Sequence, residues 1–327
     1  MRNPAFDIAI VICTFHREAL LAKALDSVNA QRRPAGLRVC VVVSDNSDGE
    51  TARDVVAAKA AASPFPMRWI AAHPANISVA RNSGVAAADA RYIAFIDDDQ
   101  ELEPGWLEAV ADAIARLPHD IFFGAVEASF EAPALATPLT RQLFSRRLDA
   151  PSGAEMFAMG PNKTQGVALA TNNAVFRHAA MPDPAAPFDA AFGHGGGEDY
   201  DLVCRMQNNG CRFAWLPQAR ASEFVPAARC EPAYLRRRFY TGAQIFALVV
   251  ANARTRPRLA RWLLRGKAAA QAMLLAAALP AHALRGRIAL RDYSYVWAGV
   301  LGKMSFGGVH PIYRTMTPDG RPASPTR

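Results

Sequence analysis

Apolar and polar positions alternate in a regular order over the first 130 residues. Near-continuous apolar runs, typical of strands covered on both faces of a parallel sheet, occur at Ile8–Cys13, Arg38–Ser44, Met67–Ala71 and Tyr92–Ile96. Segments with helical spacing follow these runs, at Glu18–Gln31, Glu50–Ala62, Ser78–Ala88 and Gly105–Arg116. Strands that alternate with helices predict βαβ units. We therefore expect an α/β fold with a doubly wound, mostly parallel sheet flanked by helices.

The pattern is less regular from residue 121 to residue 225. Beyond Ile121–Phe130, the Pro- and Ala-rich stretch Ala132–Pro161 indicates loops and short helices over the sheet. A strand-like segment follows at Thr171–Phe176. The glycine-rich loop Gly193–Gly197 then precedes a predicted helix at Glu198–Asn208.

The last hundred residues predict long helices. Two helical patterns span Tyr234–Ala253 and Leu259–Leu284. The longest stretch without charge, Ala268–Leu284, has 17 residues and contains a glutamine, a proline and a histidine, so it is at or below the length needed to cross a bilayer. We expect an interfacial helix whose flanking arginines meet anionic headgroups. A packed helical subdomain and a membrane span are the alternatives.

The charge of the chain is divided unevenly. The formal net charge is +8, but 17 of the 37 Lys and Arg residues lie from residue 226 onward, with only three of the 29 acidic residues. We therefore divide the chain into an acidic body, residues 1–225, and a basic helical extension, residues 226–327. The extension is expected to meet an anionic partner, either a membrane surface or nucleic acid. An apolar content of 51% excludes a disordered chain.

The cysteines and the first residues indicate a reduced, cytosolic protein. Five cysteines occur without a CxxC pair, which favours structural thiols over a disulfide framework or a zinc site. The apolar run near the N-terminus is short and follows Asp7, so we expect a buried strand there instead of a signal peptide.

Polar residues follow the predicted strands at the edge where α/β sheets bind ligands. Thr14 follows the first strand, Asp45 the second, and Asp97-Asp98-Asp99 the strand at Tyr92–Ile96. Three consecutive carboxylates repel one another unless a cation compensates them, and oxygen ligands of this kind suit Mg²⁺ or Mn²⁺. The alternative is an acidic, solvated turn that caps the next helix.

A second acidic pair, Glu198-Asp199, lies at a predicted helix N-terminus directly after Gly195-Gly196-Gly197. These glycines would let the backbone approach a ligand closely. One carboxylate of the pair could act as a general base for a hydroxyl. The alternative is that both carboxylates cap the helix and complement its dipole.

Five ordered motifs resemble the inverting nucleotide-sugar glycosyltransferases of family 2, which have the GT-A fold. They are VICTFHREALLAKALDSVNAQ (11–31), VVVSDNSDG (41–49), NISVARNSGVAAA (76–88), YIAFIDDDQELEPGWL (92–107) and GGGEDYDLVCRM (195–206). The later stretch RCEPAYLRRRFYTGAQ (229–244) is similar to the continuation found in bacterial surface-polysaccharide transferases of the succinoglycan type.

The resemblance implies a nucleotide site. Thr14 and Arg17 would edge the pocket, and Asp45 would accept a hydrogen bond from the imide of a uracil-type base. Arg81 corresponds to the basic residue near the nucleotide, and Asp98 would lie beside the ribose or the metal. Family members commonly carry GSTD after the second strand, and this chain departs from that pattern with Asn-Ser-Asp at 46–48.

The resemblance also implies a metal site and a catalytic base. Asp97 and Asp99 match the outer carboxylates of the family's DxD motif, which would hold Mn²⁺ or Mg²⁺. Asp199 matches the catalytic base, and Glu198 is its partner in the ED motif.

Other residues are weaker candidates. His194 could contact the diphosphate or the acceptor, and Arg236-Arg237-Arg238 could reach the diphosphate, because arginine forks fit phosphate oxygens. Asn172-Asn173 is a candidate for acceptor contact. Trp106 could stack on a sugar ring, although a buried helix aromatic is the more common outcome.

These observations predict a metal-dependent, inverting glycosyltransferase that uses a nucleotide-sugar donor, with a UDP-sugar favoured. The acceptor would be a glycan or a lipid-linked saccharide in bacterial surface-polysaccharide or glycolipid synthesis, at the cytoplasmic face of the inner membrane. A nucleotidyltransferase is the alternative, but it needs a glycine-rich, basic loop after the first strand, where this chain has Thr-Phe-His-Arg. Nucleic acid is not expected as a partner, because the basic extension lacks interleaved aromatics and the body is acidic.

Overall fold

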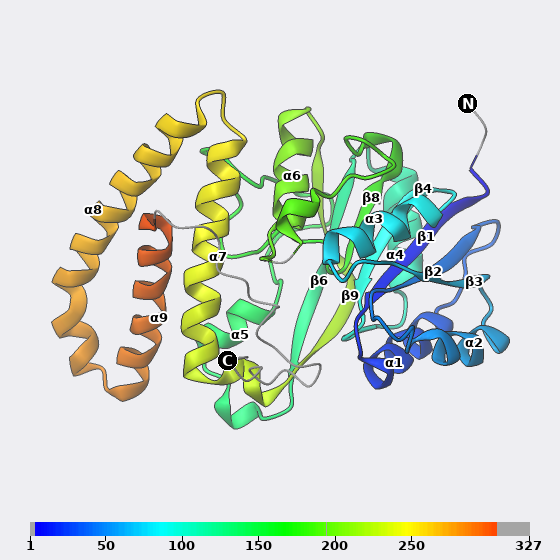
Figure 1. Ribbon diagram of the computed structural model, residues 1–327, viewed down its shortest axis with the longest axis horizontal. Helices are drawn as coiled ribbons and strands as arrows, with labels where there is room; N and C mark the ends of the chain where they lie inside the picture. The colour runs from blue at the N-terminus through cyan, green and yellow to red at the C-terminus, as the bar shows by residue number, and fades with distance from the viewer. Residues whose placement is uncertain (1–3, 194, 306–327) are drawn as a thin grey trace.

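The computed structural model describes residues 4–193 and 195–305 (Figure 1). The strands are β1 (Phe6–Thr14), β2 (Val39–Asp45), β3 (Met67–Ala71), β4 (Ala90–Asp97), β5 (Gln100–Leu102), β6 (Ile121–Phe130), β7 (Glu155–Met156), β8 (Ala174–Arg177) and β9 (Phe213–Val225). The helices are α1 (Glu18–Asn29), α2 (Arg53–Ala61), α3 (Ile77–Ala87), α4 (Trp106–Arg116), α5 (Pro138–Phe144), α6 (Glu198–Asn208), α7 (Pro232–Asn252), α8 (Pro257–Leu284) and α9 (Arg287–Met304).

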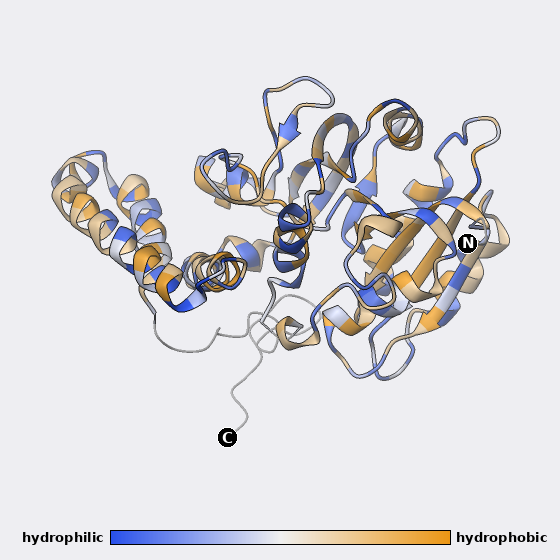
Figure 2. Cartoon of the chain, turned by 90° about the horizontal axis from the view of Figure 1, so that it is seen from above, coloured by the Kyte–Doolittle hydropathy of each residue, from blue (hydrophilic) through white to orange (hydrophobic). Residues whose placement is uncertain are grey.

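One mixed sheet forms the centre of the molecule, with the path β3-β2-β1-β4-β8-β6-β9-β5 in the described residues. The strands β3, β2, β1 and β4 are parallel, and they are the apolar runs that the sequence pattern predicts. β1, β2 and β4 are mostly buried because helices cover both faces, whereas β3 at the edge of the sheet is partly exposed. The strands are mostly hydrophobic in the right-hand part of Figure 2.

Antiparallel strands complete the other half of the sheet. β8 runs antiparallel to both β4 and β6, and β5 and β7 run antiparallel to β9. β6 and β9 are parallel, with a register shift between Gly124 and Ala125. The predicted α/β fold with helices on both faces of the sheet is confirmed, and the sheet is mixed beyond β4.

Side chains of β1 alternate between the two faces of the sheet, so each face has its own core. Ile8, Ile10 and Ile12 pack with residues of α1, α2 and α4. Ala9 and Val11 face the other side, with residues of α3, α6 and α7. This arrangement holds the carboxyl end of β1 between two packed layers.

The described part of the basic extension, residues 226–305, forms three α-helices side by side, at the left of Figure 1. α7 and α8 match the two predicted helices, whereas α9 is not predicted from the pattern. α7 also enters the core of the body, where Ile245 and Val249 are buried. The division at residue 225 stays a prediction based on charge. None of the helices in the described part of the chain is both long and apolar enough to cross a membrane.

Candidate active site

The predicted site residues of the first motifs lie at neighbouring strand ends. In the register of the sheet, Thr14 at the end of β1 is opposite Asp45 at the end of β2. On the other side of β1, Cys13 is opposite Asp97 at the end of β4. These three strands are parallel, so their polar terminal residues share one edge of the sheet, as the sequence predicts.

The loop after β4 is tied to the loop after β1. Thr14 Oγ1 donates to Asp98 Oδ2 at 2.9 Å. Arg17 Nη1 lies 3.0 Å from Asp98 Oδ1 and 3.1 Å from Asp99 Oδ2. A second guanidinium, from Arg229, lies 3.5 Å from Asp99 Oδ2. Two arginines far apart in the sequence therefore meet at one carboxylate.

The aspartates after β4 concentrate negative charge in a poorly solvated place. Removal from bulk water raises the pKa of Asp97 to about 7; Arg81 opposes this shift, while Asp99 and Glu223 add to it. Burial also raises the pKa of Asp98, against the effect of Arg17. A divalent cation would relieve this excess of negative charge.

The donor set after β4 fits a cation that shares its coordination with a ligand. Within residues 4–193 and 195–305, no three His, Cys, Asp or Glu side chains come together as a group that could hold a metal ion. Mg²⁺ and similar ions are commonly held by one or two carboxylates together with substrate phosphates and water. Asp97 and Asp99 supply two carboxylates of this kind.

The ED motif at the start of α6 is joined to the strand ends through Arg81 of α3. Arg81 is buried and forms an ion pair with Glu198. Burial alone would lower the pKa of Arg81, but Glu198, Asp199 and Asp97 raise it above its ordinary value. The guanidinium therefore stays charged between the two acidic motifs.

The two acids of the ED motif differ in exposure. Glu198 is buried, and its Oε2 atom has no hydrogen-bond partner among the described residues. Burial raises the pKa of Glu198, and Asp199 adds to this effect against Arg81. Asp199 is only half-buried, and one of its oxygens accepts a hydrogen bond from the Tyr200 N–H at 2.6 Å. A second molecule could therefore reach Asp199 more easily than Glu198.

The glycines before α6 have a structural reason as well. Gly196 and Gly197 have φ angles of +81° and +100°, which side chains rarely adopt. A Cβ atom at Gly197 would collide with Ile245 of α7. The close approach at Gly197 is therefore between α6 and α7.

Asp45 organises the loop after β2. It is fully buried, and its carboxylate accepts hydrogen bonds from the Ser47 N–H at 3.0 Å, the Ala52 N–H at 2.9 Å and Trp69 Nε1 at 3.3 Å. Burial would raise the pKa of Asp45, but a hydrogen bond from the Ser47 hydroxyl at 2.5 Å, together with the three bonds above, lowers it below its ordinary value. Its predicted contact with a nucleotide base stays a prediction.

The departure from the family pattern at residue 46 has a local function. Asn46 Nδ2 donates to the carbonyl oxygens of Ala72 and Pro74, and Asn46 Oδ1 accepts from the Asn76 N–H at 2.7 Å. This side chain joins the loop after β2 to the start of α3, the helix that contains Arg81.

Two charged residues at this edge are not predicted from the sequence. Glu223 of β9 accepts hydrogen bonds at 3.1 Å from both Gln100 and Asn172. Burial raises the pKa of Glu223, and Asp99 adds to the shift. Arg146 is also buried, and burial lowers its pKa to about 10. Glu223 is two residues from both Ala221 and Val225, which are buried, so it lies on the same face of β9. This spacing is the signal that could have indicated an inward-facing acid.

Arg146 holds the segment before β8. It donates to the carbonyl oxygens of Ala168 and Asn173 at 3.0 and 3.2 Å and also contacts Asn172 Oδ1. Asn172 Nδ2 in turn faces Glu223, so Asn172 belongs to the polar edge of the site.

The weaker candidates have mixed outcomes. Asn173 is buried and accepts a hydrogen bond from Trp106 Nε1 at 2.7 Å, so both side chains belong to the core. Stacking of Trp106 on a sugar ring is therefore wrong. Arg236 and Arg237 are exposed on α7, and their contact with a diphosphate stays a prediction. His194 lies outside the described residues.

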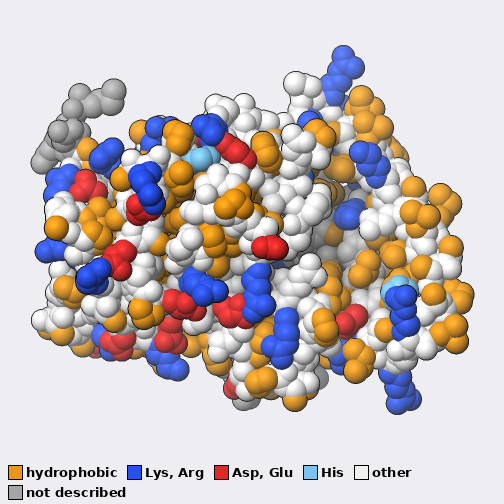
Figure 3. Space-filling model, turned by 180° about the vertical axis from the view of Figure 1, so that it is seen from behind, with side chains coloured by type: hydrophobic (Ala, Val, Ile, Leu, Met, Phe, Trp, Pro, Cys, Tyr) orange, Lys and Arg blue, Asp and Glu red, His pale blue; other side chains and the backbone are white. Residues whose placement is uncertain are grey.

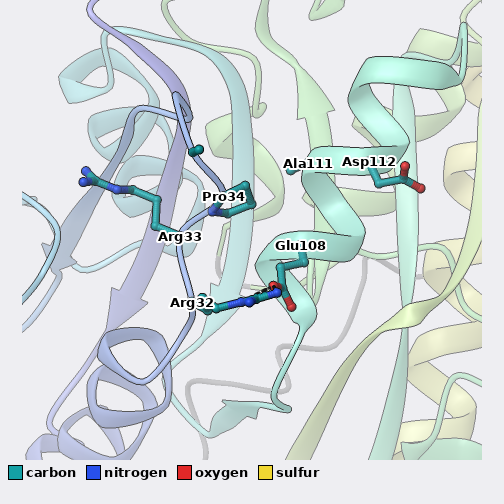
Figure 4. A pocket seen from close by; sticks show the side chains of 7 residues that line it. Arg32, Arg33, Pro34, Glu108, Ala111 and Asp112 are labelled. Atoms are coloured by element: carbon teal, nitrogen blue, oxygen red, sulfur yellow. Dashed lines mark hydrogen bonds and ion pairs between the residues drawn. The ribbon is translucent and has the colours of Figure 1, made fainter.

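A separate surface hollow of about 450 Å³ lies next to α4 (Figure 4). Its lining includes Arg32, Pro34, Glu108 and Ala111, and Arg32 pairs with Glu108. None of its lining residues is a predicted site residue, and we assign no function to it.

Comparison with known proteins decides the family. Residues 9–177 match the sequence profile described as Glycosyl transferase family 2, which is more than half of the chain. The chain belongs to this family. Within glycosyl transferase family 2, it is similar to the succinoglycan biosynthesis protein ExoM of Rhizobium meliloti (strain 1021). The two are 29% identical over 307 residues, which cover 92% of this chain and 95% of ExoM.

Solved structures support the fold. The chain is similar to S. aureus TarS 1-349, with a TM-score of 0.55 and 15% identity over 78% of this chain and 68% of that one. The same TarS fragment in complex with UDP-GlcNAc gives a TM-score of 0.54 and 16% identity, over 78% of this chain and 69% of that one. At this identity the likeness shows a shared fold.

Proposed function

We propose that this family 2 protein is a metal-dependent, inverting glycosyltransferase that moves a sugar from a nucleotide-sugar donor to an acceptor hydroxyl. The observation that best supports this proposal is the position of Arg81. It forms an ion pair with Glu198 of the ED motif, and the negative charges of Asp97 and Asp199 also raise its pKa. One charged residue thus joins the acidic group after β4 to the acidic group that starts α6.

In the proposed reaction, the oxygen of the acceptor hydroxyl forms a bond to the anomeric carbon as the bond to the diphosphate oxygen breaks. The acceptor proton passes to Asp199, and the nucleoside diphosphate leaves with the electron pair of the broken bond. A single base is sufficient for this displacement, in contrast to the carboxylate pair of glycosidases. The half-exposed position of Asp199 supports its role as the base.

Asp97 and Asp99 would hold Mn²⁺ or Mg²⁺, which, when bound, neutralises the charge that develops on the diphosphate. Arg17 and Arg229 would stabilise the negative charge of the same diphosphate, since both lie within ion-pair distance of Asp99. Removal of the metal with a chelator should abolish transfer, and added Mn²⁺ or Mg²⁺ should restore it.

We infer that the donor is a UDP-sugar. Thr14, Arg17, Asp45 and Asp98 lie at adjoining strand ends and loops, where the nucleotide would bind. TarS, which has the same fold, has been crystallised with UDP and with UDP-GlcNAc. These complexes support the inference, which does not extend to the identity of the sugar.

We infer an acceptor that is a glycan or a lipid-linked saccharide of a bacterial surface polysaccharide, used at the cytoplasmic face of the inner membrane. The similarity to ExoM over nearly the whole of both chains supports this setting. The cationic extension supports a position next to anionic lipid.

The test is a transfer assay with a panel of radiolabelled UDP-, GDP- and TDP-sugars and lipid-extract acceptors, with Mn²⁺ and with chelator. We expect metal-dependent transfer from a UDP-sugar, with the product linkage inverted relative to the donor. Release of pyrophosphate from a sugar phosphate and a nucleoside triphosphate would instead indicate a nucleotidyltransferase.

A further inference from the structure

The outer side of α8 is apolar along its whole length. Exposed residues repeat at helical spacing, among them Leu259, Leu263, Ala270, Met273, Leu274 and Leu284. The exposed fractions of Leu263, Met273 and Leu274 are 59%, 69% and 73%. α8 has 28 residues and is therefore about 42 Å long. A soluble surface rarely exposes an apolar stripe of this extent without a partner.

Two uncharged polar side chains in the apolar half of α8, Gln271 and His282, face α9. Gln271 accepts a hydrogen bond from Lys303 Nζ of α9 at 3.1 Å. The ring of His282 stacks on Tyr293 of α9, with the ring centres 4.2 Å apart. The glutamine and the histidine therefore contact α9, and neither of them interrupts the apolar stripe on the outer side of α8.

Positive charge surrounds the apolar side. Between Glu231 and Asp292 the sequence contains twelve Lys and Arg residues and no acidic residue. From the helical step of about 100° per residue, Arg258 and Lys267 lie on opposite sides of the apolar stripe, and Arg285 follows its end. Basic and hydrophobic side chains are neighbours at the right-hand edge of Figure 3, the side of the molecule that holds the helical extension. The helices at the left of Figure 2 are largely hydrophobic, with hydrophilic segments between.

We propose that the outer side of α8 binds an anionic membrane, with the helix in the plane of the surface. The apolar stripe enters the boundary between headgroups and acyl chains, and the flanking arginines and lysines bind lipid phosphates. A second copy of this chain is a poorer partner, because two cationic surfaces repel each other. The proposal names a partner for the proposed function and depends on that function only for the cellular setting.

Flotation of the purified full chain with lipid vesicles tests the proposal. We expect binding to vesicles of equal parts phosphatidylcholine and phosphatidylglycerol, weak binding to phosphatidylcholine alone, and release by high salt. Leu274→Glu should lower the partition coefficient at least about tenfold, because it removes a large apolar side chain from the stripe. Leu135→Glu is the matched control, since Leu135 is an exposed leucine of the body, 49% accessible, and makes the same change of charge.

Three results would overturn the proposal: binding that does not depend on phosphatidylglycerol, equal binding of the Leu274 and Leu135 variants, or a dimer in solution that Leu274→Glu dissociates. Met273→Glu, with thermal unfolding of each variant, separates loss of binding from loss of folding. The assay needs neither donor nor acceptor. A protein that binds vesicles but transfers no sugar would contradict the proposed function alone, and one that transfers sugar without binding would contradict this proposal alone.

Discussion

Single buried charges organise the site. Arg81 and Glu198 form a pair that is almost removed from water, and Asp97 lies close enough to share the positive charge. Loss of one member of a buried pair leaves the other without compensation, which costs more than the pair itself contributes. Arg81 therefore determines both the stability of this region and the charge that a ligand meets.

For Arg81→Met we expect a decrease in the free energy of unfolding of about 3–5 kcal/mol, because Glu198 would remain buried and unpaired. Urea denaturation measures it. Arg116→Met is the control, since Arg116 pairs with Asp112 on the exposed side of α4 and should contribute less than about 1 kcal/mol. Equal losses in the two variants would show that the buried pair has no special role.

For Asp99→Ala we expect weaker donor binding in the presence of Mn²⁺ and little change in its absence, because the side chain is a proposed metal ligand. Calorimetric titration of UDP with and without Mn²⁺ measures the difference. Asp112→Ala removes an exposed aspartate from α4 and is the control. If both variants bind UDP with the same dependence on Mn²⁺, the metal assignment is wrong.

Most of the candidate site could be predicted at the scale of residues, because its acids stand directly after apolar strands or at a helix start. Thr14, Asp97 and Asp199 belong to such local patterns. Glu223, Arg146 and Arg229 do not: each is a single charged residue whose importance depends on a distant partner, as with Arg229 and Asp99.

At the scale of elements, the contact between α6 and α7 fixes the ED motif relative to the basic extension. Gly197 precedes the first residue of α6 and has a left-handed backbone. The side chain of Ile245 of α7 occupies the space that a Cβ atom at Gly197 would need. Because α7 packs on this glycine, the start of α6 and the extension are parts of one packed unit.

For Gly197→Ala we expect a larger loss of stability than for Gly210→Ala. Both glycines have positive φ angles, so each substitution costs about 1–2 kcal/mol in backbone strain. Only Gly197 has a neighbour in the way, which adds about 1–3 kcal/mol of overpacking, whereas Gly210 has open space. Thermal or urea unfolding of both variants checks this, and losses of the same size would contradict the packing argument.

The elements that the sequence predicts are those with a strong local pattern. The four parallel strands are near-continuous apolar runs, and α6 is predicted with its observed bounds. β5 and β7 are too short to give a pattern, and they exist because β9 pairs with them from far along the chain. The start of α9 is not predicted from the apolar pattern, although Gly286, with a φ angle of +97°, separates α9 from α8.

At the scale of the whole molecule, the acidic body and the basic extension present different surfaces. The body holds the acidic edge of the sheet, and the extension presents an apolar and cationic helix on the opposite side of α7 (Figure 1). This arrangement would bring the proposed reaction site and the proposed membrane-binding surface together in one molecule. The proposed lipid-linked acceptor would be met at that surface.

The most direct test of the account compares sugar transfer by the wild-type protein, Asp199→Asn and Asp201→Asn, with UDP binding measured in parallel. Asp201 lies in the same turn of α6, where it pairs with Arg205 at 2.7 Å. We expect Asp199→Asn to bind UDP normally but to lose about 10²–10⁴ in turnover, the usual contribution of a general base, while Asp201→Asn keeps most of its activity. Turnover by Asp199→Asn close to that of the wild type would contradict the account.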